Sequence, residues 1–221
     1  MEENATALAR TTVPDIAKAM PAGLLDVASI VRLKAGEPLF RTGGKVRNAY
    51  LAISGEVRLN RTGRSGVEIT LQRSRMGFVA EASLDSKAYH CDAIASVDST
   101  LLAFPAELFK AALTNDPAFS RHWQRLLARE VRKLRAQCER LGLKTAEERI
   151  VHYLESEGVD GAVELSMTKK EWATDLGLTH EALYRALKRL KVAGSLRTEG
   201  ALIFVSASRA PAITDIDQVT P

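Results

Sequence analysis

The sequence has only two cysteines, Cys91 and Cys138, among its 221 residues. Two cysteines are too few for a disulfide framework, so we expect both thiols to be reduced, as in a cytosol. No run approaches the roughly 18 uncharged apolar residues of a membrane span. Glu2 and Glu3 stand where a secretory signal would be basic. These absences predict a soluble, cytoplasmic protein with no membrane partner.

The residue patterns of enzymes and metal sites are also missing. The histidines are scattered without ligand spacing at positions 90, 122, 152 and 180, and the chain has no glycine-rich phosphate loop. A β-barrel metal enzyme of the cupin type would need a His-x-His cluster with a carboxylate, which makes it the weakest alternative. We therefore expect no catalytic residue and no metal site, and the sequence identifies no cofactor.

Positive charge is unevenly distributed along the chain. The net charge is +4 overall, and counting by segment gives +5 over residues 117–143, +1 over 1–116 and zero over 144–209. A basic protein can have a nucleic-acid partner without requiring one. Because the excess lies on one predicted helix, charge alone does not identify a DNA-binding element.

The first half of the chain reads as a β-rich domain. Residues 1–12 lack a periodic pattern, so we expect a flexible N-terminus over 1–14, followed by an amphipathic helix from Pro14 to Val27. Between Ile30 and Phe104 short alternating runs are separated by glycine and turn residues, as at 56–60 and 67–71. This spacing predicts a β-roll or barrel, and we assign residues 15–116 to this β-rich domain.

A long helix is predicted over residues 117–143. Asp116 is a candidate N-cap, Pro117 suits the first helical position, and no breaker follows before Gly142. A coiled-coil seam, spaced 4, 3, 4 and 3, is formed by Leu127, Val131, Leu134, Cys138 and Leu141. At 1.5 Å per residue the helix would be about 40 Å long, which favours dimerisation over the alternative of a helix packed only on its own chain. The break at 142–144 is a predicted hinge.

The C-terminal part, residues 144–209, has the pattern of a winged helix-turn-helix, with a tail over 210–221. Thr145 and Glu148 form a capping-box pattern that opens a helix over 146–157. A second capping box opens a short helix that Gly177 stops, and Thr179 then caps another helix. The outward face of that helix comprises His180, Glu181, Tyr184, Arg185, Lys188 and Arg189. Two short strands about a Glu-Gly turn would form the wing. The alternative is a helical hairpin that serves only as scaffold.

The run from Met167 to Leu190 resembles the winged helix-turn-helix of the CRP/FNR regulators, and the resemblance extends over about residues 15–206. It implies an α+β fold with an N-terminal cyclic-nucleotide-binding-like β-roll, a long dimerisation helix and a C-terminal winged helix-turn-helix. It also implies a homodimer on palindromic double-stranded DNA, and RNA polymerase as a partner if the protein is an activator.

The same resemblance places the DNA-reading residues. Glu181 and Arg185 match a base-reading pair, and the chemistry agrees, because a carboxylate accepts from cytosine and arginine is bidentate to guanine. His180 stands where cAMP-responsive members have another base-reading arginine, and Tyr184 occupies a variable reading position. The residues better placed for phosphates are Thr168, Lys170, Thr179 and Lys188.

The resemblance makes the β-roll over residues 15–116 a sensor domain, but this domain lacks part of the family's phosphate-binding cassette. Glu81 matches, but His90 and Cys91 replace the Arg-Ser pair, which removes a bidentate phosphate clamp. Effector contacts from the long helix would come from Glu130, Leu134 and Arg135. We therefore predict a regulator that does not respond to cAMP.

Several effector alternatives stay open. They are a cyclic nucleotide, haem held by a single histidine, redox sensing through Cys91 or Cys138, and no effector at all. An N-terminal iron–sulfur site like that of FNR itself is excluded, because no cysteine precedes Cys91. The alternative without any sensing role is that Cys91 packs as a small buried hydrophobic residue.

Overall fold

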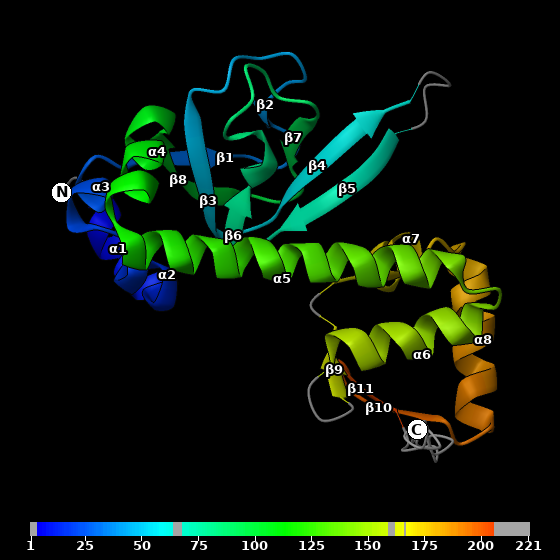
Figure 1. The fold of residues 1–221 in the computed structure, drawn as a ribbon. Helices are drawn as coiled ribbons and strands as arrows, with labels where there is room; N and C mark the ends of the chain where they lie inside the picture. The colour runs from blue at the N-terminus through cyan, green and yellow to red at the C-terminus, as the bar shows by residue number, and fades with distance from the viewer. Residues whose placement is uncertain (1–3, 64–67, 159–161, 166, 206–221) are drawn as a thin grey trace, which may run out of the picture. The chain divides into compact units, whose positions relative to one another are not determined.

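The computed structural model describes residues 4–63, 68–158, 162–165 and 167–205. The chain divides into two compact units, Met1–Leu126 and Leu127–Pro221 (Figure 1). The long helix α5 (Pro117–Gly142) was predicted to form a segment of its own between two domains, but the division falls inside it. Its first turns belong to the first unit and its remainder to the second.

The first unit is a β-roll of two four-stranded antiparallel sheets. One sheet has the strand order β1-β8-β3-β6 and the other has the order β2-β7-β4-β5. The strands are β1 (Ser29–Leu33), β2 (Pro38–Phe40), β3 (Asn48–Ser54), β4 (Val57–Thr62), β5 (Glu68–Ser74), β6 (Gly77–Val79), β7 (Asp92–Ala95) and β8 (Ser99–Pro105). The predicted β-roll is confirmed.

Alternation along the strands builds the core of the roll. In β4, Val57 and Leu59 are buried and Arg58 between them is half-buried, because successive strand residues face opposite sides of a sheet. The cluster also contains Ala52, Val79, Tyr89, Cys91, Ala93 and Leu101. Gly55 starts the turn into β4 with a φ of +77°, and a Cβ there would lie 2.3 Å from the Ser99 hydroxyl oxygen. Only glycine fits this turn.

The N-terminal segment differs from its prediction. Residues 5–12 form a helix, α1 (Ala5–Thr12), so the expectation of a flexible N-terminus is wrong for them. The Asn4 side chain caps the helix by accepting a hydrogen bond from the Thr6 amide at 2.9 Å, and Ala9 is fully buried. Capping and burial supply the stability that the weak periodicity did not reveal.

The predicted single helix over 14–27 is two helices, α2 (Pro14–Ala19) and α3 (Ala22–Asp26). Pro21 causes the break, because proline drives the residue before it out of the helical region. Met20 accordingly has φ −81° and ψ 140°. Together with α4 (Ala106–Asn115), these helices gather at one end of the roll (Figure 1).

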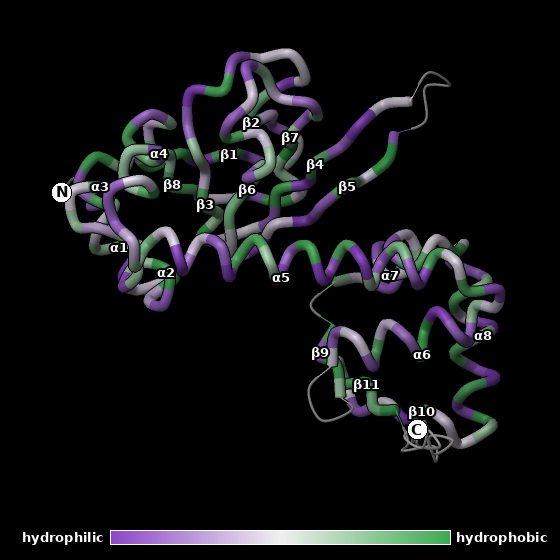
Figure 2. The backbone as a smooth tube through the Cα atoms, viewed as in Figure 1, coloured by the Kyte–Doolittle hydropathy of each residue, from purple (hydrophilic) through white to green (hydrophobic). Residues whose placement is uncertain are grey.

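An aromatic cluster joins the start of α5 to the roll. The Trp123 ring lies 4.7 Å from Phe78 and 5.1 Å from Phe109, both in edge-on contacts, and Phe109 also meets Phe119 at 5.4 Å. The helix begins as predicted, because the Asp116 carboxylate accepts hydrogen bonds from the amides of Ala118 and Phe119, each at 2.9 Å. Hydrophilic residues predominate along α5 (Figure 2). No helix among the described residues is long and apolar enough to span a membrane.

The second unit contains the rest of α5 and a winged helix-turn-helix. Its elements are α6 (Ala146–Glu157), β9 (Ala162–Glu164), α7 (Lys169–Asp175), α8 (His180–Val192), β10 (Leu196–Glu199) and β11 (Leu202–Val205). The predicted wing is β10 and β11, which pair antiparallel, and β9 adds a third strand along β11 that the sequence analysis missed. The core packs α6, α7 and α8 around fully buried Trp172, Leu176 and Leu183.

Candidate nucleic-acid interface and effector pocket

Two threonine caps fix where the two helices of the helix-turn-helix begin. The Thr168 hydroxyl oxygen accepts from the Glu171 amide at 3.3 Å, and the Glu171 carboxylate accepts from the Thr168 amide at 2.9 Å, which completes the predicted capping box. The Thr179 hydroxyl oxygen accepts from the Ala182 amide at 3.1 Å. Gly177 has a φ of +63° between them, as the turn requires. The caps and the turn are as predicted.

The outward face of α8 is as predicted. Leu183, Ala186, Leu187 and Leu190 are buried in the core. The residues predicted to face outward or to meet DNA are all exposed: Thr168 and Lys170 at the start of α7, and Thr179, His180, Glu181, Tyr184, Arg185, Lys188 and Arg189 at the start of α8 and along it. Glu181 and Arg185, four residues apart, share one helix face. This face can therefore enter a groove with a carboxylate and a guanidinium side by side.

Tyr184 is held in place by two neighbours. Its ring lies 4.6 Å from the His180 ring in an edge-on contact. The ammonium of Lys169, on α7, lies 5.1 Å from the centroid of the Tyr184 ring. Tyr184 is nonetheless 46% exposed. The sequence analysis did not single out Lys169. Its position just after a helix cap, where side chains often meet phosphates, was the available signal.

Some basic residues near this face already have partners. Arg189 pairs with Glu147 of α6, which lowers the pKa of that carboxyl. In the wing, Arg197 lies over the Phe204 ring at 4.2 Å and pairs with Glu199 at 2.9 Å. The Thr168 hydroxyl donates to the Glu171 carboxylate at 2.9 Å. The candidate phosphate contact of Thr168 must therefore compete with its own cap.

The candidate effector residues fall in both units. Glu81, His90 and Cys91 lie in the first, and Glu130, Leu134 and Arg135 lie on the part of α5 in the second. Glu130 pairs with Lys133 at 2.9 Å, whereas Leu134 and Arg135 are exposed. Leu134 is also part of the predicted dimer seam, in which Val131, Cys138 and Leu141 are likewise exposed and Leu127 is half-buried.

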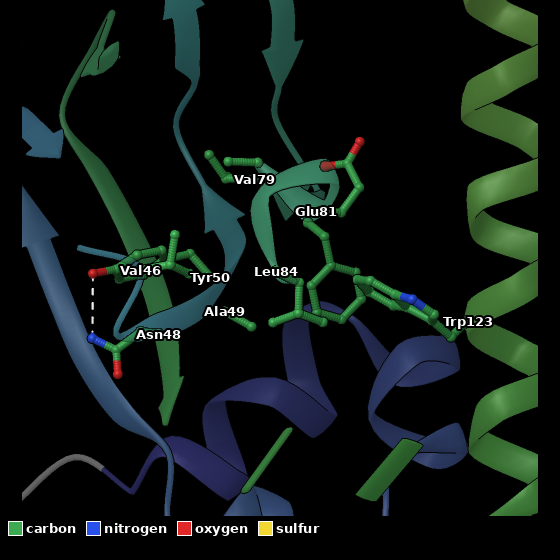
Figure 3. A pocket seen from close by; sticks show the side chains of 10 residues that line it. Val46, Asn48, Ala49, Tyr50, Val79, Glu81, Leu84 and Trp123 are labelled. Carbon is green, nitrogen blue, oxygen red and sulfur yellow. Dashed lines mark hydrogen bonds between the residues drawn. The ribbon is translucent and has the colours of Figure 1, made fainter. Parts of the chain in front are cut away.

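A small cavity lies beside Glu81 in the first unit. Leu84 and Trp123 line one side and Val46, Asn48 and Tyr50 the other (Figure 3). Its volume is about 10 Å³, enough for one water molecule and far below the roughly 300–1,000 Å³ of small-molecule sites. This cavity is too small for a nucleotide. Trp123 was missed as a lining residue, although its spacing of four from Phe119 marks a shared face.

His90 and Cys91 face different surroundings. The His90 Nδ1 is 2.8 Å from the Ser83 hydroxyl and the residue is exposed, whereas Cys91 is fully buried. Burial raises the pKa of the Cys91 thiol, and the negative charge of Asp92 raises it further. Because the thiolate is the reactive form, these shifts favour the packing role for Cys91. Among the residues that the structure describes, no three His, Cys, Asp or Glu side chains form a group that could hold a metal ion.

Ala80, just before Glu81, is strained. It is the one described non-glycine residue with a positive φ, at 57° with ψ 37°, which costs a residue with a Cβ about 1–2 kcal/mol. We expect Ala80→Gly to relieve this strain and offset the loss of the methyl group. The control is Ala49→Gly, on strand β3 beside the same cavity. There the loss of the methyl group is not offset by any relief of backbone strain.

The difference between the two variants should be about 1–2 kcal/mol in the free energy of unfolding, with Ala80→Gly the more stable. Urea denaturation measures it. Equal destabilisation by both substitutions would show that the Ala80 backbone is not strained in solution.

Comparison with known proteins agrees with this architecture. Residues 30–116 match the family profile "Cyclic nucleotide-binding domain". The "Cyclic AMP receptor protein" of Thermus thermophilus is 30% identical over 165 residues, which cover 73% of this chain and 76% of that protein. The "Transcriptional activator protein FnrA" of Stutzerimonas stutzeri is 28% identical over 177 residues, covering 76% and 72%. The solved structure of FixK2 from Bradyrhizobium japonicum, 24% identical, shares the fold with a TM-score of 0.63 over 81% of this chain and 92% of that one.

Proposed function

Because the chain belongs to the CRP/FNR family of transcription regulators, we propose that it binds a palindromic DNA site sequence-specifically as a homodimer. The observation that carries the proposal is the exposed face of α8, on which Glu181 and Arg185 follow the Thr179 cap. His180 and Tyr184 read bases beside them, and Lys170, Thr179 and Lys188 meet phosphates. Half-sites would lie about one helical turn apart.

The exposed stripe on α5 supports the homodimer. Val131, Leu134 and Leu141 are 45%, 51% and 48% exposed, with Cys138 exposed among them. Apolar side chains at this spacing on a polar helix are typical of a coiled-coil seam, which a second copy of the chain would cover. A homodimer also matches the two-fold symmetry of a palindromic site.

We further propose that the regulator does not respond to cAMP. His90 and Cys91 replace the phosphate clamp, His90 lies against Ser83, and the Cys91 thiol is buried. The alternative is a cyclic-nucleotide effector, which the name of the Thermus relative favours. The name of the Stutzerimonas relative supports activation. RNA polymerase is the further partner that we propose for an activator.

Sedimentation and gel shift together test these proposals. The wild-type chain is expected to sediment as a dimer and to select a palindrome from random duplex DNA. Leu134→Glu would place a charge in the seam, so we expect a monomer whose palindrome affinity falls at least tenfold. Ala128→Glu adds the same charge at an exposed position of α5 beside the seam but not in it, and should weaken both properties far less.

The gel shift is repeated with and without millimolar cAMP. A palindrome affinity that rises tenfold with cAMP would contradict the proposed insensitivity. A Leu134→Glu variant that remains dimeric would rule out the α5 seam, and a wild-type chain that selects no sequence would rule out the proposed function.

A further inference from the structure

Arg149 of α6 holds four backbone carbonyls from two different helix ends. Its Nε donates to the Leu143 carbonyl at 3.0 Å and its Nη2 to the Leu141 carbonyl at 3.2 Å, where α5 ends. Its Nη1 donates to the carbonyls of Leu176 and Gly177, at 3.2 and 3.1 Å, where α7 ends. The half-buried guanidinium therefore joins the last turn of the long helix to the turn of the helix-turn-helix.

The chemistry of helix ends explains why an arginine stands here. The last carbonyls of a helix have no partner within it and carry partial negative charge. Two such ends that meet would repel each other. A guanidinium is always charged, and its planar fork of five N–H donors can serve both ends at once. A lysine ammonium carries the same charge on a single compact group.

Close packing supports the same joint. A Cβ on Gly177 would lie 2.8 Å from the Leu141 Cδ2 and 3.2 Å from the Arg149 Nη1, so the two helix ends touch directly. Arg140, 3% exposed, makes a second tie from α5 to α6. Its Nη2 donates to the Ser156 hydroxyl at 3.0 Å, and its guanidinium lies 4.7 Å from the Tyr153 ring centroid.

We propose that Arg149 is a positioning residue that fixes the recognition helix α8 to the end of α5. Residues 142–144, which the sequence marks as a hinge, are then spanned by the guanidinium and do not form a free joint. A rotation of the last turn of α5 would reach α8 through Arg149 and the turn at Gly177. The effect on DNA rests on the proposed function, but the joint itself does not.

Spin-label distances test the joint without DNA. Labels are placed at Arg132→Cys on α5 and Val192→Cys on α8, both exposed, in a Cys138→Ser background. Dilution with unlabelled protein suppresses distances between the two chains of a dimer. We expect one narrow distance with Arg149 present and a distribution at least twice as broad in Arg149→Met. Lys144→Met, which removes an exposed cation near the same helix start, should keep the narrow distance.

DNA binding supplies the second readout. Arg149→Met should bind the palindrome at least tenfold more weakly while its affinity for random DNA changes no more than in Lys144→Met. If Arg149→Met fails to fold by circular dichroism, Arg149→Lys replaces it and should broaden the distance as well. An unbroadened distance in the folded variant, or equal behaviour of Lys144→Met, would overturn the proposal. A wild-type chain with a narrow distance that binds no palindrome would instead overturn the proposed function.

Discussion

Replacing Arg185 by alanine is expected to abolish specific DNA binding and leave only weak, salt-sensitive binding. Arg185 is exposed on α8 four residues after Glu181, where a guanidinium can donate two hydrogen bonds to guanine. Such a bidentate contact is worth about 1–3 kcal/mol of discrimination, and a homodimer makes it in both half-sites. The expected loss is therefore about 2–6 kcal/mol, or roughly 30-fold to more than 10,000-fold in affinity for the palindrome.

The matched control for this variant is Arg189→Ala. It removes the same charge from the same helix one turn later, but the Arg189 guanidinium pairs with Glu147 of α6. We expect its palindrome affinity to fall by less than about tenfold, with sequence preference unchanged. Gel shifts at several salt concentrations separate the loss of base contacts from the loss of phosphate contacts, because phosphate contacts set the salt dependence of binding. Full palindrome affinity in Arg185→Ala would show that this side chain does not read a base.

The second large effect is expected in the β-roll, at Glu56. Its side chain is only 5% exposed, and its two carboxylate oxygens receive Arg73 Nη1 at 3.1 Å and Arg75 Nε at 2.8 Å. The arginines themselves are 11% and 30% exposed. Glu56→Gln removes the negative charge that faces both guanidinium groups. Breaking a buried ion pair by removing one partner costs about 3–5 kcal/mol.

Glu107→Gln is the control for that prediction. Glu107 also pairs with a cation, Lys110, but its side chain is 87% exposed, so its loss should cost at most about 1 kcal/mol. Urea denaturation in a Trp172→Phe background, in which Trp123 on the roll is the single remaining tryptophan, measures both variants by fluorescence. If the two substitutions shifted the unfolding midpoint equally, the Glu56 cluster would be no more than a surface ion pair. Partial recovery of stability on also replacing Arg73 with methionine would confirm that the lost pairing between Glu56 and Arg73 contributes to the effect.

The helix-turn-helix was predictable because its signals are local. Thr168, Thr179 and Gly177 act within three residues along the chain, and a cap or a left-handed turn depends little on what packs around it. Alternation in β4 and the Asp116 cap of α5 were predictable for the same reason. The helix at residues 5–12 was missed, although its Asn4 cap is a local signal; the burial of Ala9 that accompanies it arises only when the chain folds.

The candidate effector site was predictable only in part. Glu81, His90 and Cys91 were identified by their place in a motif, but the sequence gives no sign of how the chain closes around them. Trp123 lies beside Glu81 in the small cavity, and Ala80 takes a conformation that alanine avoids. The place of Trp123 depends on how α5 packs on the roll, and the conformation of Ala80 belongs to the turn between β6 and Glu81.

The sequence by itself thus determined the order of the elements, the faces of the helices and which residues of α8 are exposed. Short-range hydrogen bonding and side-chain periodicity fix all of these. The tertiary structure alone decided where the chain divides, that Arg189 is paired with Glu147, and that Arg149 spans the predicted hinge. These features join residues far apart in the sequence, such as Glu147 with Arg189 or Arg149 with Gly177, and only packing brings such residues together.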